Sequence, residues 1–277
     1  GQPPRPFRPQ RRHLALLSTG DGAIAAWGPV AAGGDREIVT HGGLRYGYPE
    51  LAQRVRCLGS VLAALGVSAG TRVAVLDRDT HRYLEAYFAV PMLGAVLMTA
   101  NIRLSAEQLR YTLEHSGTRL VLAAAEFVPL LREALEGVAN RPQLVVMGED
   151  GAYDSLMAAA DAGFAFPEVD EESVATHFYT TGTTGLPKGV TYTHRQLVEH
   201  TLAVGFALAA ADDYQSLRQG DVYMPLTPMF HVHAWGLPYV ATLLGLKQVY
   251  PGCKVVGLEP VQCPTLYNNG YGSHDIQ

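Results

Sequence analysis

Apolar positions in the first part of the chain follow two different patterns. Between Glu50 and Leu65, five apolar residues recur at intervals of four and three, which places them on one face of a helix. Gly66 follows directly, as is common where a helix ends. The run TRVAVLD at 71–77 instead predicts a short buried strand. The pattern therefore predicts a helix followed by a strand.

The alternation continues up to residue 147. Ser105 and Gln108 are spaced to form a capping box at the start of one helix, and Gly117 is expected to end it. Strands that alternate with helices at this spacing favour parallel pairing through right-handed crossovers, and so an α/β domain. Helices are expected at 81–95 (broken or kinked near Pro91), 105–117 and 126–138, and strands at 96–100, 118–123 and 141–147.

An acidic, loop-rich connector with one short helix separates this series from a second one. We therefore expect an N-terminal arm over 1–34, a first α/β subdomain over 35–165 and a second over 166–277. In the second series, strands are expected at 174–181, 221–228 and 247–251, and helices at 194–210 and 235–245.

Composition narrows the class of protein. The 277 residues are 48% hydrophobic and 17% charged, which is ordinary for a soluble globular protein. A net charge of −5 gives no bias toward nucleic acid. Three cysteines make no disulfide framework and favour a reducing, cytoplasmic location. The most apolar window, 86–100, is shorter than the about 20 residues of a membrane span. The arm has no signal-peptide pattern, and a disordered arm is favoured over a basic anchor.

The stretch YTTGTTGLPKG at 179–189 combines hydroxyls, backbone amides and one lysine, Lys188. Because it falls between an expected strand and an expected helix, we place it at the carboxyl edge of a parallel sheet, where free amides and a helix N-terminus bind anions. It is not a Walker loop, since Pro187 stands where that motif needs glycine. The stretch favours binding of a triphosphate or pyrophosphate; the alternative is a threonine-rich surface turn.

TTGTTGLPKGV closely resembles the phosphate-binding signature of the adenylate-forming superfamily, which includes acyl-CoA synthetases, luciferases and peptide-synthetase adenylation domains. PMFHVHAWGLPYVATLLGLKQVYPG at 228–252 resembles the next motif of the fatty-acyl branch. Residues 35–55 resemble the entry segment of the same branch, and residues 80–116 resemble its first subdomain. The resemblance implies an α/β fold: the large N-terminal domain of these enzymes, with two mostly parallel sheets flanked by helices. We expect this chain to lack the small C-terminal domain.

The resemblance implies a two-step reaction. A carboxylate attacks ATP in the presence of Mg²⁺ to form an acyl-adenylate and pyrophosphate, and coenzyme A then displaces AMP. Lys188 is implied to be catalytic, because a cation there stabilises charge on the departing pyrophosphate. Thr184 is also an implied Mg²⁺ ligand. The implied phosphate-binding residues are Thr180, Thr181, Gly182, Thr183, Thr184, Gly185 and Lys188.

Two residues of the second motif carry implied roles. His231 matches a catalytic histidine beside the acyl carboxylate, and its alternative is a structural histidine. Trp235 matches a gate on the fatty-acyl tunnel, and its alternative is an aromatic side chain packed in the core. His231 and His233 also form an H-x-H pair, but without a third matched ligand a metal site is disfavoured.

The resemblance ends after Gly252. GYGSHD resembles a shortened GYG-x-T-E motif, so Tyr271 and Gly272 are implied adenine contacts. Asp275 stands where the Mg²⁺-binding glutamate is expected, and His274 where threonine is expected. No counterpart follows for the ribose-binding aspartate, the hinge or the catalytic lysine of the small domain.

We therefore expect a truncated fatty-acid–CoA ligase that is inactive alone. The alternatives are a nucleotide- or acyl-binding remnant without turnover and an aryl or amino-acid adenylating enzyme. The expected partner is a carboxylic acid, with no nucleic acid and no transmembrane segment. Acyl length is not encoded in any pattern, and a homodimer stays open.

Overall fold

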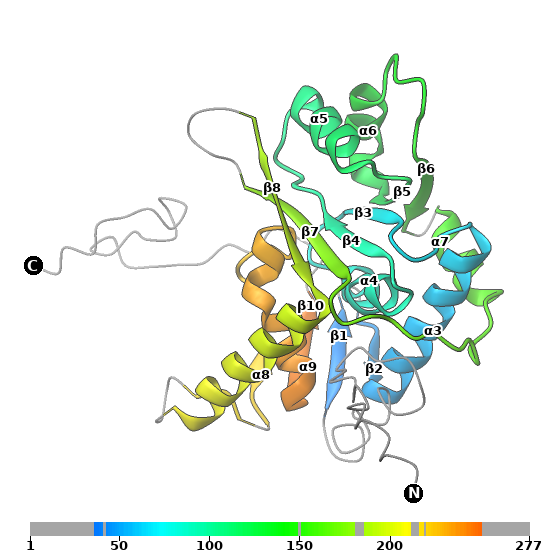
Figure 1. Ribbon diagram of the computed structural model, residues 1–277. Helices are drawn as coiled ribbons and strands as arrows, with labels where there is room; N and C mark the ends of the chain where they lie inside the picture. Colours follow the sequence, from blue (N-terminus) through cyan, green and yellow to red (C-terminus); the bar gives the residue numbers. More distant parts are fainter. Residues whose placement is uncertain are drawn as a thin grey trace, which may run out of the picture.

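The computed structural model describes residues 36–40, 43–148, 151–180, 186–211, 216–218 and 220–250. Within these ranges, strands and helices alternate and build two sheets flanked by helices (Figure 1). The strands are β1 (Glu37–Thr40), β2 (Arg45–Gly47), β3 (Arg72–Leu76), β4 (Val96–Thr99), β5 (Leu120–Ala124), β6 (Gln143–Met147), β7 (Val174–Thr180), β8 (Lys188–Thr193), β9 (Val222–Tyr223) and β10 (Lys247–Tyr250). The helices are α3 (Tyr48–Ala64), α4 (His81–Met92), α5 (Ala106–Ser116), α6 (Val128–Ala134), α7 (Ala152–Ala158), α8 (His194–Ala210) and α9 (Leu237–Leu244), with 3₁₀ turns η1 (Ala125–Phe127) and η3 (Val232–Gly236).

Both sheets are mostly parallel, as predicted. The larger sheet has the order β6-β5-β3-β4-β7-β8, and all of its pairs are parallel except β7 with β8. The smaller sheet has the order β2-β1-β10-β9, and only β1 with β2 is antiparallel. Each sheet takes strands from both sides of the boundary expected at 165/166, so that boundary does not separate the sheets. The division into an arm and two subdomains otherwise stays a prediction.

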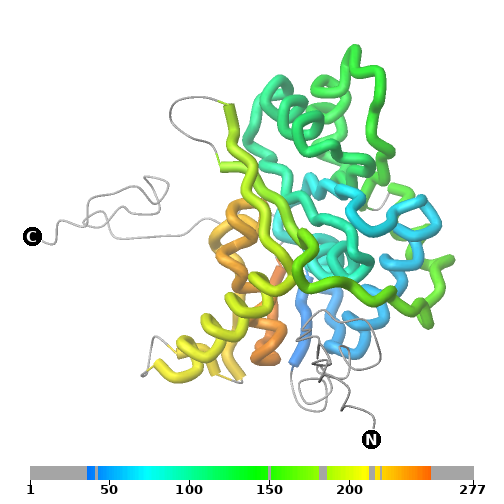
Figure 2. The backbone as a smooth tube through the Cα atoms, viewed as in Figure 1, coloured from blue at the N-terminus to red at the C-terminus, as the bar shows by residue number. Residues whose placement is uncertain are grey.

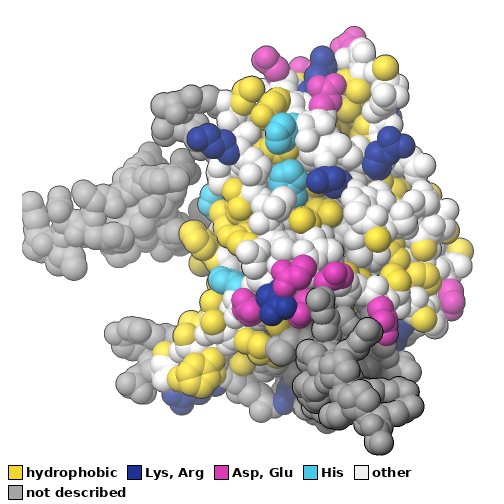
Figure 3. All heavy atoms as spheres, in the orientation of Figure 1, with side chains coloured by type: hydrophobic (Ala, Val, Ile, Leu, Met, Phe, Trp, Pro, Cys, Tyr) yellow, Lys and Arg dark blue, Asp and Glu magenta, His cyan; other side chains and the backbone are white. Residues whose placement is uncertain are grey.

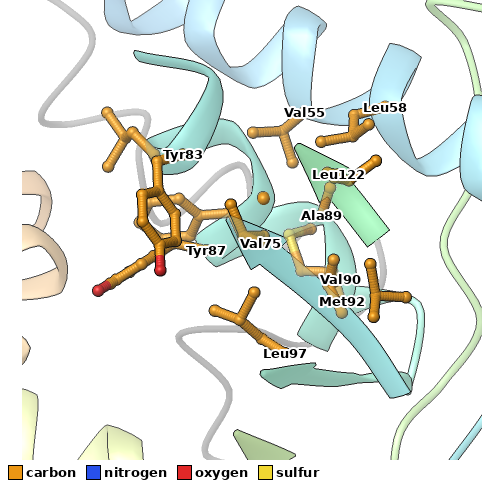
Figure 4. Packing of buried hydrophobic residues seen from close by; sticks show 14 of the residues in the cluster. Val55, Leu58, Val75, Tyr83, Tyr87, Ala89, Val90, Met92, Leu97 and Leu122 are labelled. Carbon is orange, nitrogen blue, oxygen red and sulfur yellow. The ribbon is translucent and has the colours of Figure 1, made fainter. Parts of the chain in front are cut away.

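The core has layers on both faces of the larger sheet. Along β3, Val73 and Val75 join the cluster between the sheets, while Ala74 and Leu76 join the cluster under α5 and α6. A central parallel strand is expected to be apolar on both faces for this reason. Figure 4 shows side chains of α3 and α4, including Leu58 and Tyr87, meeting strand residues in the first cluster. The continuous apolar run of β3 is therefore explained by burial on two sides.

Local signals for helix ends act as the sequence predicts. Ser105 accepts a hydrogen bond from the Gln108 amide at 3.2 Å, and the Gln108 side chain accepts one from the Ser105 amide at 3.3 Å. Gly117 ends α5 with φ of +68°, a left-handed conformation that glycine adopts without strain. Pro91 lies in the last turn of α4, which ends at Met92. These boundaries depend on near neighbours in the chain.

The expectation that the glycine-rich loop joins a strand to a helix is wrong. β8 follows the loop and pairs antiparallel with β7, with Thr180 opposite Lys188. The loop therefore connects two strands of a hairpin, and α8 begins only after β8, at His194. The six residues after Pro187 are polar as often as apolar, so their pattern does not predict a strand; their β-branched residues are the only local signal for β8. The positive end of α8 cannot assist anion binding at the loop.

The structure also shortens or adds other elements. Within the range 221–228, where a strand is expected, only β9 forms, and β1 and β2 are strands that the sequence pattern does not predict. Helices α8 and α9 lie side by side beyond the hairpin (Figure 2). In the ranges given above, no helix has the length and hydropathy required to cross a bilayer.

Candidate functional site

The hairpin of β7 and β8 places the two described residues of the predicted phosphate loop together. β7 runs parallel to β4, so Thr180 lies at the carboxyl edge of the larger sheet. The Thr180 hydroxyl donates to the backbone carbonyl of Lys188 at 3.4 Å, and both side chains are exposed. The other loop residues, Thr181, Gly182, Thr183, Thr184 and Gly185, lie outside the described residues, as do Tyr271, Gly272, His274 and Asp275.

The structure explains why a glycine occupies position 189, which the sequence alone did not indicate. A Cβ atom at this position would lie 2.5 Å from Nε2 of His177, which no real side chain tolerates without movement. The φ angle of Gly189 is not in the left-handed region. The glycine therefore lets β8 pass close to the His177 ring.

The segment 228–236 carries the residues of the second predicted motif. His231 is exposed, and Trp235 is 58% exposed, so the alternative of a tryptophan packed in the core is wrong. The helix expected from residue 235 instead begins at Leu237, after a left-handed turn. The gate role of Trp235 stays a prediction.

This left-handed turn is the clearest strain in the described backbone. Four consecutive residues other than glycine, Val232–Trp235, have φ between 47° and 58°, and Gly236 continues with 72°. A left-handed helical conformation costs about 1–2 kcal/mol for each such residue, and most for a β-branched one such as Val232. A backbone under such strain persists only where surrounding contacts hold it.

The turn packs against the hairpin and α8. The His233 ring lies 5.1 Å from the Phe178 ring of β7, edge to face. Nε2 of His200, on α8, is 3.0 Å from the backbone carbonyl of Trp235. Figure 3 shows histidine side chains on the same face of the molecule as the hairpin. The turn that carries His231 and Trp235 therefore packs against β7 at Phe178, two residues before Thr180.

Two buried histidines line this contact. His233 is 2% exposed, and neither ring nitrogen has a hydrogen-bond partner in the described part of the chain. Burial lowers the pKa of His233 to about 3, and it lowers the pKa of His177 to about 4. Both rings are therefore neutral near neutral pH.

The H-x-H pair does not converge on a common ligand position. His231 is exposed whereas His233 is buried among aromatic rings. Across the described ranges, no group of three or more His, Cys, Asp and Glu side chains is placed to hold a metal ion.

Asp77, just after β3, is a buried carboxyl that the sequence reasoning missed. It accepts hydrogen bonds from the Arg78 amide at 2.8 Å and from the Thr80 hydroxyl. Burial raises its pKa to about 7. Thr80 is the N-cap of α4, so Asp77 supports the start of that helix.

Comparison with known proteins assigns this chain to a family. Residues 28–264 match the family of AMP-binding enzymes, and the chain belongs to that family. The structure superimposes on the crystal structure of the anthranilate CoA ligase AuaEII in complex with anthranoyl-AMP with a TM-score of 0.72 at 21% identity. That match covers 86% of this chain and 44% of the other, and it shows the fold alone.

The sequence relatives are acyl-CoA ligases. A long-chain-fatty-acid–CoA ligase of Thermus thermophilus is 45% identical over 224 residues, which are 80% of this chain and 40% of that protein. A medium-chain-fatty-acid–CoA ligase of Ectopseudomonas oleovorans is 36% identical over 79% of this chain and 42% of its own length. The chain thus spans about two fifths of the length of these curated relatives.

Proposed function

We propose that this chain forms the N-terminal, nucleotide-binding part of an ATP-dependent fatty-acid–CoA ligase. The observation that supports the proposal is the packing of the turn, which carries His231 and Trp235, against β7 of the hairpin, which carries Thr180 and Lys188. The identity to a long-chain-fatty-acid–CoA ligase supports a fatty acid as substrate.

The chemistry assigns distinct tasks to these residues. A carboxylate oxygen attacks the α-phosphorus of ATP, and the bond to pyrophosphate breaks. The exposed ammonium group of Lys188 and the hydroxyl of Thr180 stabilise negative charge on the leaving pyrophosphate. His231 lies beside the acyl carboxylate, and Trp235 gates the acyl chain. The thiolate of coenzyme A then attacks the acyl carbon, and AMP leaves.

Mg²⁺ enters only as a proposed partner of the triphosphate. Its proposed ligands, Thr184 and Asp275, lie outside the described residues, so no step is derived through the ion. Magnesium would neutralise phosphate charge in such a site. A cytoplasmic location and a homodimer also stay proposals.

The test is calorimetric titration of this chain with non-hydrolysable acyl-adenylate mimics whose acyl groups run from short to long, with one aromatic mimic. We expect binding strongest at one aliphatic chain length. A second titration uses a non-hydrolysable ATP analogue, which keeps the β and γ phosphates. Lys188→Ala should weaken binding of this analogue by about tenfold or more, because a charged hydrogen-bond donor to phosphate is lost. Lys247→Ala is the matched control, since Lys247 pairs with Glu37 on the smaller sheet.

Each outcome separates the alternatives. Preference for the aromatic mimic would replace the fatty-acid assignment with an aryl one. Equal binding of the ATP analogue by Lys188→Ala and the unchanged chain would remove the proposed role of Lys188. Acyl-AMP formation by the chain alone would exclude a remnant that only binds, and absence of binding to every mimic would contradict the proposal for this chain.

A further inference from the structure

Three side chains hold the backbone directly before the left-handed turn. The Asp79 carboxylate accepts a hydrogen bond from the Met229 amide at 2.6 Å. The Tyr87 hydroxyl donates to the Met229 carbonyl, and the Thr99 hydroxyl donates to the Phe230 carbonyl at 3.2 Å. These donors and acceptors come from the loop after β3, from α4 and from the end of β4. Three separate elements therefore hold one short segment.

The hydrogen bonds that Tyr87 and Thr99 make to this segment are buried. Met229 and Tyr87 are 0% exposed, and Thr99 is 2% exposed. The Tyr87 ring also lies 6.0 Å from the His233 ring inside the turn. Tyr87 and Thr99 therefore serve the core as well as the turn, and replacing either would disturb both.

Asp79 differs because it is only partly buried, and its carboxylate accepts its hydrogen bond from the Met229 amide. Burial raises the pKa of Asp79 to about 6, against the effects of the Met229 amide, Arg103 and Arg78. The carboxyl is thus ionised at about pH 7.5, and a hydrogen bond to a charged acceptor is about twice as strong as a neutral one.

The turn needs such an anchor. Its four left-handed residues would relax to the common right-handed or extended conformations unless contacts at both ends prevented it. On the far side, His200 contacts the Trp235 carbonyl. Before the turn, Asp79 contacts the backbone amide of Met229, which lies 150 positions further along the chain.

We propose that Asp79 is a positioning residue that sets the place of His231 and Trp235 through its hydrogen bond to the Met229 amide. The inference rests on the proposed function for the importance of those two side chains. The hydrogen bond itself is a matter of backbone geometry, and it is testable without any ligand.

The test uses Asp79→Ala, Asp79→Asn and, as the matched control, Glu126→Ala. Asparagine keeps an acceptor oxygen for the Met229 amide. Glu126 pairs with the neighbouring Arg78, so its removal changes charge beside the same loop and leaves Met229 untouched. Hydrogen exchange of residues 228–234 is measured at about pH 7.5, together with Trp235 fluorescence in a Trp27→Phe background, which leaves one tryptophan.

For Asp79→Ala we expect exchange at the Met229 amide to accelerate about tenfold or more, with a shifted Trp235 emission and unchanged exchange in α3. Asp79→Asn should restore most of the protection, and Glu126→Ala should match the unchanged chain. Unchanged exchange at Met229 in Asp79→Ala would overturn the proposal, and so would faster exchange spread equally over α3, because that indicates general destabilisation.

Binding of the acyl-adenylate mimic separates this proposal from the proposed function. If the unchanged chain binds the mimic, Asp79→Ala must bind it more weakly and Asp79→Asn must recover; equal binding by all three contradicts positioning. If the unchanged chain binds no mimic, the proposed function fails, and the exchange and fluorescence results alone decide the role of Asp79.

Discussion

His233 makes the stability of this protein sensitive to acid. Its ring is buried, and its pKa falls from 6.5 to about 3 on folding. Below about pH 6.5 the unfolded chain therefore binds a proton at His233 that the folded chain does not bind. The contribution of the neutral ring to the stability of the fold is present at higher pH and is lost as the pH falls toward the folded pKa.

The magnitude follows from the two pKa values. At about pH 5 the unfolded ring is almost fully protonated and the folded ring is neutral. This pH lies about 1.5 units below the unfolded pKa of 6.5. At about 1.4 kcal/mol per unit, the loss between pH 8 and pH 5 is about 2 kcal/mol. This is a large fraction of the stability of an ordinary domain.

His233→Asn removes the titrating group and suits the left-handed φ of 53°, which asparagine tolerates better than most residues. The free energy of unfolding would be measured by urea denaturation at about pH 5 and about pH 8. Between about pH 8 and about pH 5, the free energy of unfolding of the variant should rise by about 2 kcal/mol relative to that of the unchanged chain.

His233→Gln, a different shape that also lacks the proton, is the control and should show the same shift. A stability difference that stays the same at both pH values in both variants would refute the reasoning, because it would mean that the folded ring takes up its proton as readily as the unfolded one.

Two further predictions concern packing and charge. Gly189→Ala should destabilise the fold by about 1–3 kcal/mol, because the added Cβ would lie 2.5 Å from His177. Gly205→Ala is the control and should not destabilise it, because the nearest atom there is at 3.4 Å. Thermal unfolding of both variants tests this, and equal melting temperatures would contradict it. Arg54→Ala leaves the Glu85 carboxylate, 0% exposed and otherwise bonded to Tyr153, without its cation and should cost about 3–5 kcal/mol in urea unfolding. The exposed-pair variant Arg45→Ala should cost less than about 1 kcal/mol, and similar losses in the two would show that burial does not govern the Arg54 pair.

The sequence by itself determined the features that depend on near neighbours. The capping box of Ser105 and Gln108, the left-handed end of α5 at Gly117 and the buried run of β3 all involve residues close in the chain. Alternation of strands and helices was enough for parallel sheets, because the crossover rules leave few other arrangements. The family resemblance also came from contiguous motifs, and the match over 28–264 confirms it.

Only the tertiary structure decided the details of the site. Whether the residues after Pro187 form a strand depended on β7 being available as a partner, and β1 needed β10, more than 200 positions away. The left-handed turn is unfavourable locally and exists only because distant groups such as Asp79 hold it. Patterns along a chain report local preference, whereas the position of a strained turn is set by surfaces that meet only after folding.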